Sequence, residues 1–317
     1  MSSSAGLDDD SEPLRVICGP TAAGKSGLVM ALAERLSLTV VSADSRQIYR
    51  GSDIGTAKPT AAERARVPHD GIDLVTPRER FSAAAWAERA SGWVRAAREA
   101  GRTPVVVGGT GFYMRALVHP LFAEPPLDAE RRAALAAELA GCSTAELRDR
   151  CLALDPARSR LGRAQLLRAI EVAVLTGRPL TEWHTRRGGA PSRPARYLVV
   201  DPGPALGQWV EARVERMLAD GWEAEVGTLL RTVPAEAPAW NATGYGAIRD
   251  LIGGRTTRAK AVERVVVATR QYAKRQRTWF RHQLATECVT RLDPRDAAAP
   301  AQLLHWWDAR EPGGHAA

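Results

Sequence analysis

Cysteine is scarce in this chain of 317 residues, and the few cysteines lie far apart. The four thiols, Cys18, Cys142, Cys151 and Cys288, form no Cys-x-x-Cys pair and have no histidine at a metal-ligand spacing. Zinc sites and disulfide frameworks both depend on such clusters. We therefore expect reduced, buried thiols, and neither a structural zinc site nor a disulfide scaffold.

Long apolar runs are also missing. No segment approaches the roughly 20 apolar residues that cross a bilayer. The first twelve residues are rich in Ser and Asp and lack the basic and then apolar pattern of a secretory signal. We expect a globular, cytoplasmic protein with no membrane contact and a disordered leader at 1–13. At 45% hydrophobic residues, the chain can bury a large core in one or two domains.

Lysine is also scarce: only four of the 44 lysine and arginine residues are lysines. The net charge is +8, and nine arginines stand against two glutamates between 156 and 196. Clustered arginine is typical of proteins that bind a phosphate backbone. An arginine-rich composition can equally reflect a GC-rich genome, so charge alone leaves nucleic-acid binding open.

The most informative stretch is a glycine-rich loop with the pattern of a P-loop, Gly19-Pro20-Thr21-Ala22-Ala23-Gly24-Lys25-Ser26. An apolar run precedes it and a helical pattern follows, which is the context that the motif requires. Its backbone N–H groups can surround an anion, Lys25 can reach a terminal phosphate, and Ser26 can ligate Mg²⁺. The loop predicts polyphosphate binding but does not identify the compound.

Strand and helix patterns alternate along the chain. Apolar runs predict strands at 14–18, 38–42, 105–107 and 197–200, and amphipathic patterns predict helices at 81–100, 209–230 and 264–281. Such alternation is typical of a doubly wound parallel sheet, so we expect an α/β fold of the P-loop NTPase type.

Composition changes at Pro120, and Pro125-Pro126 marks a boundary. The pattern from 127 to 183 is helical throughout. We therefore predict an all-helical insertion domain that carries the arginine cluster. The expected domains are a catalytic core at 14–119 and 196–292, the insertion at 120–195 and a C-terminal tail at 293–317.

Polar residues follow several predicted strands, at the edge where parallel sheets bind ligands. Asp44 could act through water on Mg²⁺, as a general base or as a helix N-cap. Thr110 reaches the same edge after a glycine pair. Asp201 resembles a Walker B aspartate, although the following Pro-Gly-Pro favours an ordinary strand exit. Lys58 lies in a polar loop, either as a second cation for phosphate or as an exposed lysine.

A helical segment near the end is strongly basic. It has five cations and no acid from Arg270 to Arg281, which predicts that it faces phosphate or a carboxylate-rich surface.

Four runs together resemble a known family: GPTAAGKS, SADSRQIYRGSDIGTAKP, VVVGGTGFYMRAL and TRQYAKRQRTWFR. In this order and spacing they closely resemble the bacterial tRNA dimethylallyltransferases, also called isopentenyl-tRNA transferases. The resemblance runs from about Arg15 to Leu292. It implies transfer of a dimethylallyl group from dimethylallyl diphosphate to the N6 amine of adenosine-37, just 3′ of the anticodon, in tRNAs that read U-starting codons, with release of diphosphate.

The resemblance also implies roles for single residues. Asp44 would take the proton of the amine, and Lys25 and Arg213 would stabilise the diphosphate, with Mg²⁺ on Ser26. Thr110 would assist the leaving oxygen or orient the base. The P-loop residues Gly19, Pro20, Thr21, Ala22, Ala23, Gly24, Lys25 and Ser26 would bind the diphosphate.

The insertion would hold the anticodon stem-loop of the tRNA, whose target base must leave its stack. Gln47 is the predicted reader of the adenine edge, because an amide both donates and accepts. The full set of predicted tRNA contacts is Ser45, Arg46, Gln47, Lys58, Arg158, Arg160, Arg163 and Arg168. Among the four insertion arginines, only Arg168 lies in a matched family motif. We expect a monomer.

Two segments depart from the family pattern: residues 69–73, and Gly246, where many relatives carry a basic residue. The main alternative function is a P-loop kinase for a nucleoside or small molecule, with Asp44 as base and Asp201 on Mg²⁺. A second alternative is a non-catalytic, RNA-binding NTPase switch.

Overall fold

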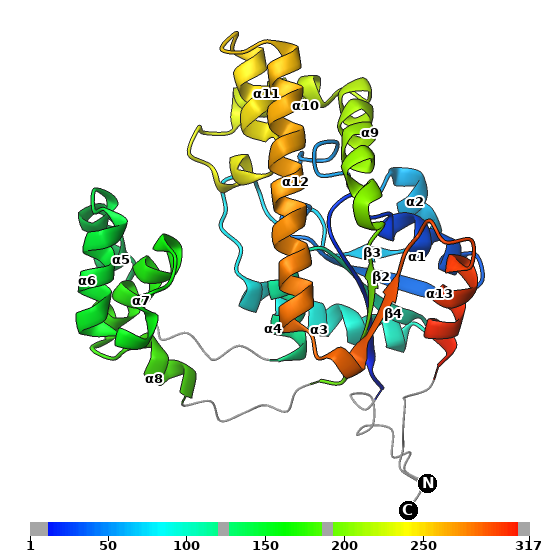
Figure 1. Cartoon of the computed structure of the whole chain (residues 1–317), viewed down its shortest axis with the longest axis horizontal. Coiled ribbons are helices and arrows are strands. Elements are labelled where there is room, and N and C mark those ends of the chain that lie inside the picture. Colours follow the sequence, from blue (N-terminus) through cyan, green and yellow to red (C-terminus); the bar gives the residue numbers. More distant parts are fainter. Residues whose placement is uncertain (1–11, 120–126, 186–192, 310–317) are drawn as a thin grey trace, which may run out of the picture. The chain divides into compact units, whose positions relative to one another are not determined.

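The computed structural model (Figure 1) describes residues 12–119, 127–185 and 193–309. The chain forms two compact units, a core of Met1–His119 with Ser192–Ala317, and an insertion of Pro120–Pro191. The predictions for residues 1–11, Pro125-Pro126, 186–192 and 310–317 lie outside the described residues. No helix in the described ranges is both long enough and apolar enough to span a membrane.

The core is built on a six-stranded sheet with the order β3-β2-β4-β1-β5-β6, and all neighbouring strands are parallel. The strands are β1 (Leu14–Cys18), β2 (Leu38–Ala43), β3 (His69–Asp70), β4 (Thr103–Gly108), β5 (Ala195–Val200) and β6 (Val289–Leu292). The central strands consist mainly of buried, β-branched residues, as expected for a sheet covered on both faces.

Nine helices are described in the core: α1 (Lys25–Ala33), α2 (Ala61–Arg66), α3 (Ala83–Glu99), α4 (Gly111–Val118), α9 (Leu206–Ala219), α10 (Trp222–Thr232), α11 (Tyr245–Ile252), α12 (Arg258–Gln283) and α13 (Ala299–Asp308). From β1 the chain moves to β2 and then to β3, which is one edge of the sheet. From β3 it turns back to β4 and continues through β5 to β6, which is the other edge. Because such crossovers are right-handed, α1 lies on one face and α3 and α4 on the other (Figure 1). The predicted doubly wound fold is confirmed.

This reversal of direction positions the site. Strands β1 and β4 are neighbours, yet the chain leaves their carboxyl ends toward opposite edges. Ligands of doubly wound sheets bind in the crevice at such a switch point. The P-loop follows β1 and the turn at Gly109 and Thr110 follows β4, so both border this crevice.

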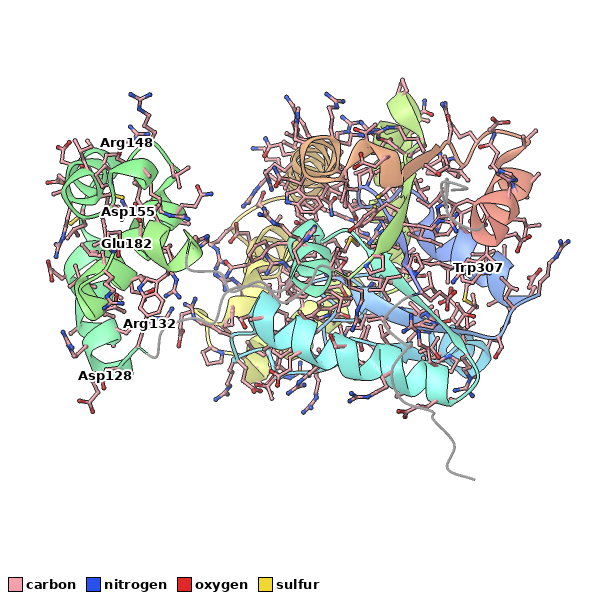
Figure 2. The ribbon with its side chains drawn as sticks, turned by 90° about the horizontal axis from the view of Figure 1, so that it is seen from below. Asp128, Arg132, Arg148, Asp155, Glu182 and Trp307 are labelled. Atoms are coloured by element: carbon pink, nitrogen blue, oxygen red, sulfur yellow. The ribbon has the colours of Figure 1, made fainter. Side chains whose placement is uncertain are left out.

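Three details differ from the expected elements. The short strands β3 and β6 were not predicted, since two polar residues and a four-residue edge strand leave little pattern. The helix expected at 209–230 is two helices, because Gly221 adopts a φ of 99° between α9 and α10. The expected C-terminal tail contains α13, whose Leu303, Trp306 and Trp307 are buried in the core. Trp307, labelled in Figure 2, also lies 4.9 Å beneath the Arg15 guanidinium.

The insertion is described as α5 (Ala129–Ala140), α6 (Thr144–Leu154), a 3₁₀ turn (Pro156–Arg158), α7 (Arg163–Thr176) and α8 (Leu180–Thr185). Leu139, Leu147, Leu166 and Ile170 form its separate hydrophobic core. The buried carboxylate of Asp155 (Figure 2) accepts hydrogen bonds from the Thr181 N–H at 3.0 Å and its hydroxyl at 2.6 Å, which joins α6 to α8.

Candidate active site

The P-loop turns sharply between β1 and α1. Gly19, Ala22 and Gly24 have positive φ values of 146°, 63° and 86°. Glycine is required at position 19, because a Cβ there would lie 2.1 Å from the carbonyl oxygen of Val200. Since α1 begins at Lys25, the loop directs the positive end of the helix into the crevice, as an anion site requires.

Lys25 folds back onto this loop. Its ammonium donates hydrogen bonds to the carbonyl oxygens of Gly19 at 3.0 Å and Pro20 at 2.7 Å. Burial among protein atoms, together with nearby Arg213, lowers the pKa of Lys25 to about 8, and the negative charge of Asp44 offsets part of this effect. The lysine therefore lies where an additional anion would be strongly favoured.

A cavity of about 490 Å³ opens beside the loop. It gathers several of the predicted site residues from separate elements, namely Thr21 to Ser26, Asp44, Gln47 and Arg213, together with Arg216 and Gln276. Burial also lowers the pKa of Arg213, as does nearby Arg216, whereas Asp44 raises it. Three cations thus face one cavity, an arrangement suited to a polyphosphate.

Asp44 immediately follows β2, and Thr110 holds the chain on both sides of it. The Thr110 N–H donates to the Ala43 carbonyl oxygen at 3.0 Å, and the Thr110 hydroxyl oxygen accepts the Ser45 N–H at 3.0 Å. The Asp44 carboxylate itself accepts the Arg46 N–H at 2.8 Å. Of the two roles considered for Thr110, this geometry favours orienting the carboxylate.

Gln276 on α12 was not predicted as a site residue. Its buried amide accepts the Thr21 N–H at 2.8 Å and donates to the Gly109 carbonyl oxygen at 2.9 Å. It therefore ties the P-loop to the turn after β4. The matched run TRQYAKRQRTWFR contains it, but only the fold shows that this glutamine reaches the loop.

Gln47 lines the cavity, but its amide is already engaged. Its nitrogen donates to the carbonyl oxygens of Thr56 at 3.3 Å and Ala57 at 3.0 Å, and its oxygen accepts the Ser42 hydroxyl at 2.9 Å. Both amide hydrogens are used within the protein. The prediction that this amide donates to and accepts from adenine therefore needs correction, because only the oxygen retains a free acceptor position.

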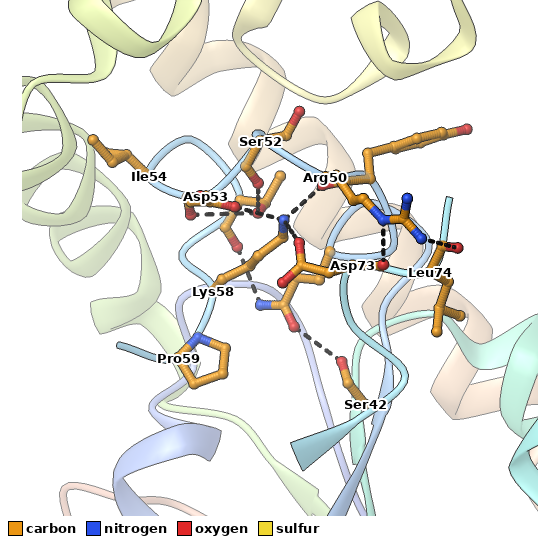
Figure 3. Close-up of polar contacts among 12 residues, drawn as sticks. Ser42, Arg50, Ser52, Asp53, Ile54, Lys58, Pro59, Asp73 and Leu74 are labelled. Carbon is orange, nitrogen blue, oxygen red and sulfur yellow. Dashed lines mark hydrogen bonds and ion pairs between the residues drawn. The ribbon is translucent and has the colours of Figure 1, made fainter. Parts of the chain in front are cut away.

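The prediction that Lys58 contacts tRNA also needs correction. Its side chain is 1% exposed, and its ammonium is held by three protein oxygens (Figure 3). An ammonium has three hydrogens, so none remains for an external phosphate.

Asp201 forms an ion pair rather than an open metal ligand. Arg277 of α12 donates to its two oxygens at 2.8 and 2.5 Å, and the Gly203 N–H donates at 2.9 Å. Asp201 is not among the residues that line the cavity. This arrangement agrees with an ordinary strand exit and does not favour the kinase alternative.

Three of the four predicted insertion arginines serve the insertion itself. Arg158 lies 3.6 Å from Asp155, and Arg168 forms an ion pair with Glu171. Arg163 donates to the carbonyl oxygen of Ala140, the last residue of α5, and to that of Cys142 just beyond the helix. These contacts correct the picture of four free phosphate contacts. Within the described residues, Arg160 is the member of this set that is exposed and has no such partner.

Within the described part of the chain, no group of three or more His, Cys, Asp or Glu residues could hold an ion. The exposed hydroxyl of Ser26 and the Asp44 carboxylate both face the cavity. This donor set suits an ion that takes most of its ligands from phosphate and water, as Mg²⁺ does.

The parallel sheet, the P-loop after β1 and the cationic cavity define a protein of the P-loop class. The family models are more specific, because IPP transferase matches residues 47–283 and isopentenyl transferase matches residues 12–68. The chain belongs to the IPP transferase family. It is a prenyltransferase enzyme, which confirms the resemblance and the enzyme class predicted from the sequence.

Curated relatives carry the same assignment along most of their length. The tRNA dimethylallyltransferase of Halorhodospira halophila is 46% identical over an alignment of 280 residues that covers 86% of this chain and 90% of that protein. The tRNA dimethylallyltransferase of Rhodospirillum centenum is 44% identical over an alignment of 292 residues that covers 90% of this chain and 92% of that protein.

Solved structures agree with these relatives. The full-length tRNA isopentenylpyrophosphate transferase of Bacillus halodurans is 32% identical, has a TM-score of 0.66, and is matched over 93% of this chain and 94% of that chain. A eukaryotic dimethylallyltransferase with 23% identity and a TM-score of 0.78, matched over 93% and 78% of the two chains, shares the fold.

Proposed function

We propose that this protein transfers the dimethylallyl group of dimethylallyl diphosphate to the N6 amine of adenosine-37 in tRNAs that read U-starting codons. The allylic carbon–oxygen bond breaks, a carbon–nitrogen bond forms, and diphosphate leaves. The observation that carries this proposal is one cavity that holds both a P-loop and a carboxylate at the end of the neighbouring strand β2. The curated names of the relatives supply the two substrates.

Asp44 is the proposed base. The lone pair of an adenine amine is conjugated with the ring, so the amine attacks well only if its proton is removed as the bond forms. The two hydrogen bonds to Thr110 support this role, because they fix the backbone on either side of the carboxylate. The proton that the amine loses is transferred to the Asp44 carboxylate.

The leaving diphosphate is the proposed ligand of Lys25, Arg213 and the P-loop N–H groups. As the carbon–oxygen bond breaks, negative charge accumulates on the diphosphate, and preformed donors stabilise it without reorganising. We propose that Ser26 would hold Mg²⁺, which would supply further positive charge beside the diphosphate.

For the tRNA we propose contacts on both units of the chain, with Arg160 as the insertion residue most available to the anticodon stem-loop. On the core, the basic helix α12 contributes a second set. Two of the five cations between Arg270 and Arg281 are engaged, Arg270 with Glu211 at 2.6 Å and Arg277 with Asp201. Exposed Lys274, Arg275 and Arg281 have no carboxylate partner within the described residues, so they can neutralise phosphate.

Incubation with unmodified tRNA, dimethylallyl diphosphate and Mg²⁺ tests the reaction directly. Mass spectrometry should show the gain of one isopentenyl unit on tRNAs that read U-starting codons. A gain on none of these tRNAs would overturn the proposal, and transfer of phosphate from ATP to a small acceptor would support the kinase instead. We place the reaction in the cytoplasm, where tRNA is available, and propose that the enzyme acts as a monomer.

A further inference from the structure

The loop from Ser52 to Pro59, here called the cavity loop, forms part of the cavity wall through Thr56, Ala57 and Pro59. It is irregular, and Ala57 has a φ of 48°, which is left-handed for a residue with a Cβ. Such a conformation persists only where the surroundings hold it. Two charged side chains, Lys58 and Glu225, hold the loop through hydrogen bonds.

Lys58 is the first anchor. Its ammonium donates to the Tyr49 carbonyl oxygen and to one carboxylate oxygen each of Asp53 and Asp73, all at 2.6 Å (Figure 3). Arg64 donates to the other oxygen of Asp73 at 2.9 Å. Burial raises the pKa of Asp73, but hydrogen bonds from Lys58 and Arg64 outweigh burial and lower it overall, so the carboxylate stays charged.

Glu225 on α10 is the second anchor. Its carboxylate accepts the backbone N–H groups of Asp53 at 2.7 Å, Ile54 at 2.6 Å and Gly55 at 3.2 Å. It also accepts the hydroxyl of Tyr245 at 2.7 Å. A carboxylate with three convergent N–H donors fixes both the position and the curvature of a loop, because bonds to an ionised acceptor are strong and directional.

Side chains of α10 and α11 pack tightly against the cavity loop at Gly55. A Cβ on Gly55 would lie 2.0 Å from the Trp222 indole nitrogen and 2.7 Å from the Tyr245 ring. The loop backbone therefore lies directly against α10 and α11, and the Glu225 hydrogen bonds set the distance of this contact.

The cavity loop in turn fixes the segment that bears the proposed base. The Gln47 amide nitrogen donates to the Thr56 and Ala57 carbonyl oxygens, and its oxygen accepts the Ser42 hydroxyl. Ser42 and Gln47 lie on either side of Asp44 in the chain. A displacement of the loop therefore displaces Gln47 and, through it, the segment around Asp44.

We propose that Glu225 and Lys58 are positioning residues for prenyl transfer. They hold the cavity loop against the Ser42–Gln47 segment and so set the position of Asp44 relative to the acceptor amine. This inference rests on the proposed function. It also separates the positioning of Asp44 from the binding of diphosphate, since the P-loop is held by Gln276 and not by either anchor.

The test compares Glu225→Gln with Glu223→Gln. The first change keeps the side-chain shape but turns an amide N–H group toward backbone donors, and the second only breaks an exposed ion pair of α10 with Arg258. For Glu225→Gln we expect kcat with tRNA to fall about ten- to hundredfold, the cost of a small misplacement. Diphosphate affinity, measured by calorimetry, should stay within about twofold. Glu223→Gln should match the wild type in kcat and in diphosphate affinity.

The outcomes are distinct. A wild-type protein without transfer activity refutes the proposed function. An active wild type with an equally active Glu225→Gln variant refutes the positioning role, and so does a parallel loss of diphosphate affinity. If Glu225→Gln does not fold, Tyr245→Phe removes one of the four hydrogen bonds to the carboxylate. That variant should lower kcat by a smaller factor without weakening diphosphate binding, and unchanged kcat would refute the inference.

Discussion

The substitution Gln276→Met tests how the P-loop is held in place. Methionine has a similar volume but neither of the two hydrogen bonds that join Thr21 and Gly109 through the buried glutamine amide. Each bond contributes about 0.5–1.5 kcal/mol net. Because Thr21 lines the cavity and its N–H can be hydrated once freed, we expect the free energy of unfolding to fall by only about 1–2 kcal/mol.

The same energy limits the effect on binding. A loop that loses about 1–2 kcal/mol of preorganisation must recover it when diphosphate binds, so the dissociation constant should rise about 5- to 30-fold. Calorimetric titration with diphosphate measures this change, and urea unfolding measures the stability.

An exposed glutamine of the same helix provides the control. Gln271→Met should leave the stability and the diphosphate affinity unchanged. If Gln276→Met binds diphosphate as tightly as Gln271→Met does, the Gln276 contact does not hold the P-loop in its binding conformation. A large loss of stability without a loss of affinity would mean that the glutamine supports the fold alone.

Three further predictions concern charged groups. Asp44→Asn should lower kcat by at least about 100-fold while the affinities for tRNA and diphosphate change less than about threefold, and activity within a few-fold of wild type would show that another group is the base. The pKa of Lys25 is lowered to about 8, and a bound anion raises it again. Binding of dimethylallyl diphosphate without tRNA should therefore take up protons at pH 9, where free Lys25 is largely neutral, but not at pH 7. Equal calorimetric heats of binding at pH 9 in buffers of different ionisation enthalpy would contradict this. In the insertion, Arg160→Glu should flatten the salt dependence of tRNA binding. Arg163→Glu should mainly lower stability, because it leaves the end of α5 uncapped. An unchanged salt slope for Arg160→Glu would place the tRNA contact elsewhere.

Local patterns were sufficient where a motif is contiguous. The P-loop, the carboxylate after the second apolar run and the Gly-Gly-Thr turn were all found, because each depends on neighbouring residues and on the rule that parallel strands end at a common edge. Two-residue β3 and the break at Gly221 were missed, because a short strand has no period and a single glycine is tolerated within a helical pattern.

Charge predicted the contacts of single residues less well than the motifs did. Lys58 and Arg163 were expected to contact phosphate, yet the structure uses Lys58 for two carboxylates and a carbonyl group and Arg163 for the end of a helix. A sequence shows that a residue is charged but not which oxygens lie near it, and buried cations look the same as exposed ones in composition.

The sequence by itself determined the family, the fold class and the anion-binding loop, since these depend on short runs whose backbone conformations follow from their own residues. Only the tertiary structure decided which distant side chains hold those runs in place. Gln276 meets Thr21 across 255 positions and Glu225 meets Asp53 across 172. Contacts at such separations form when the folded sheet and helices bring the partners together, and no local pattern in the chain records them.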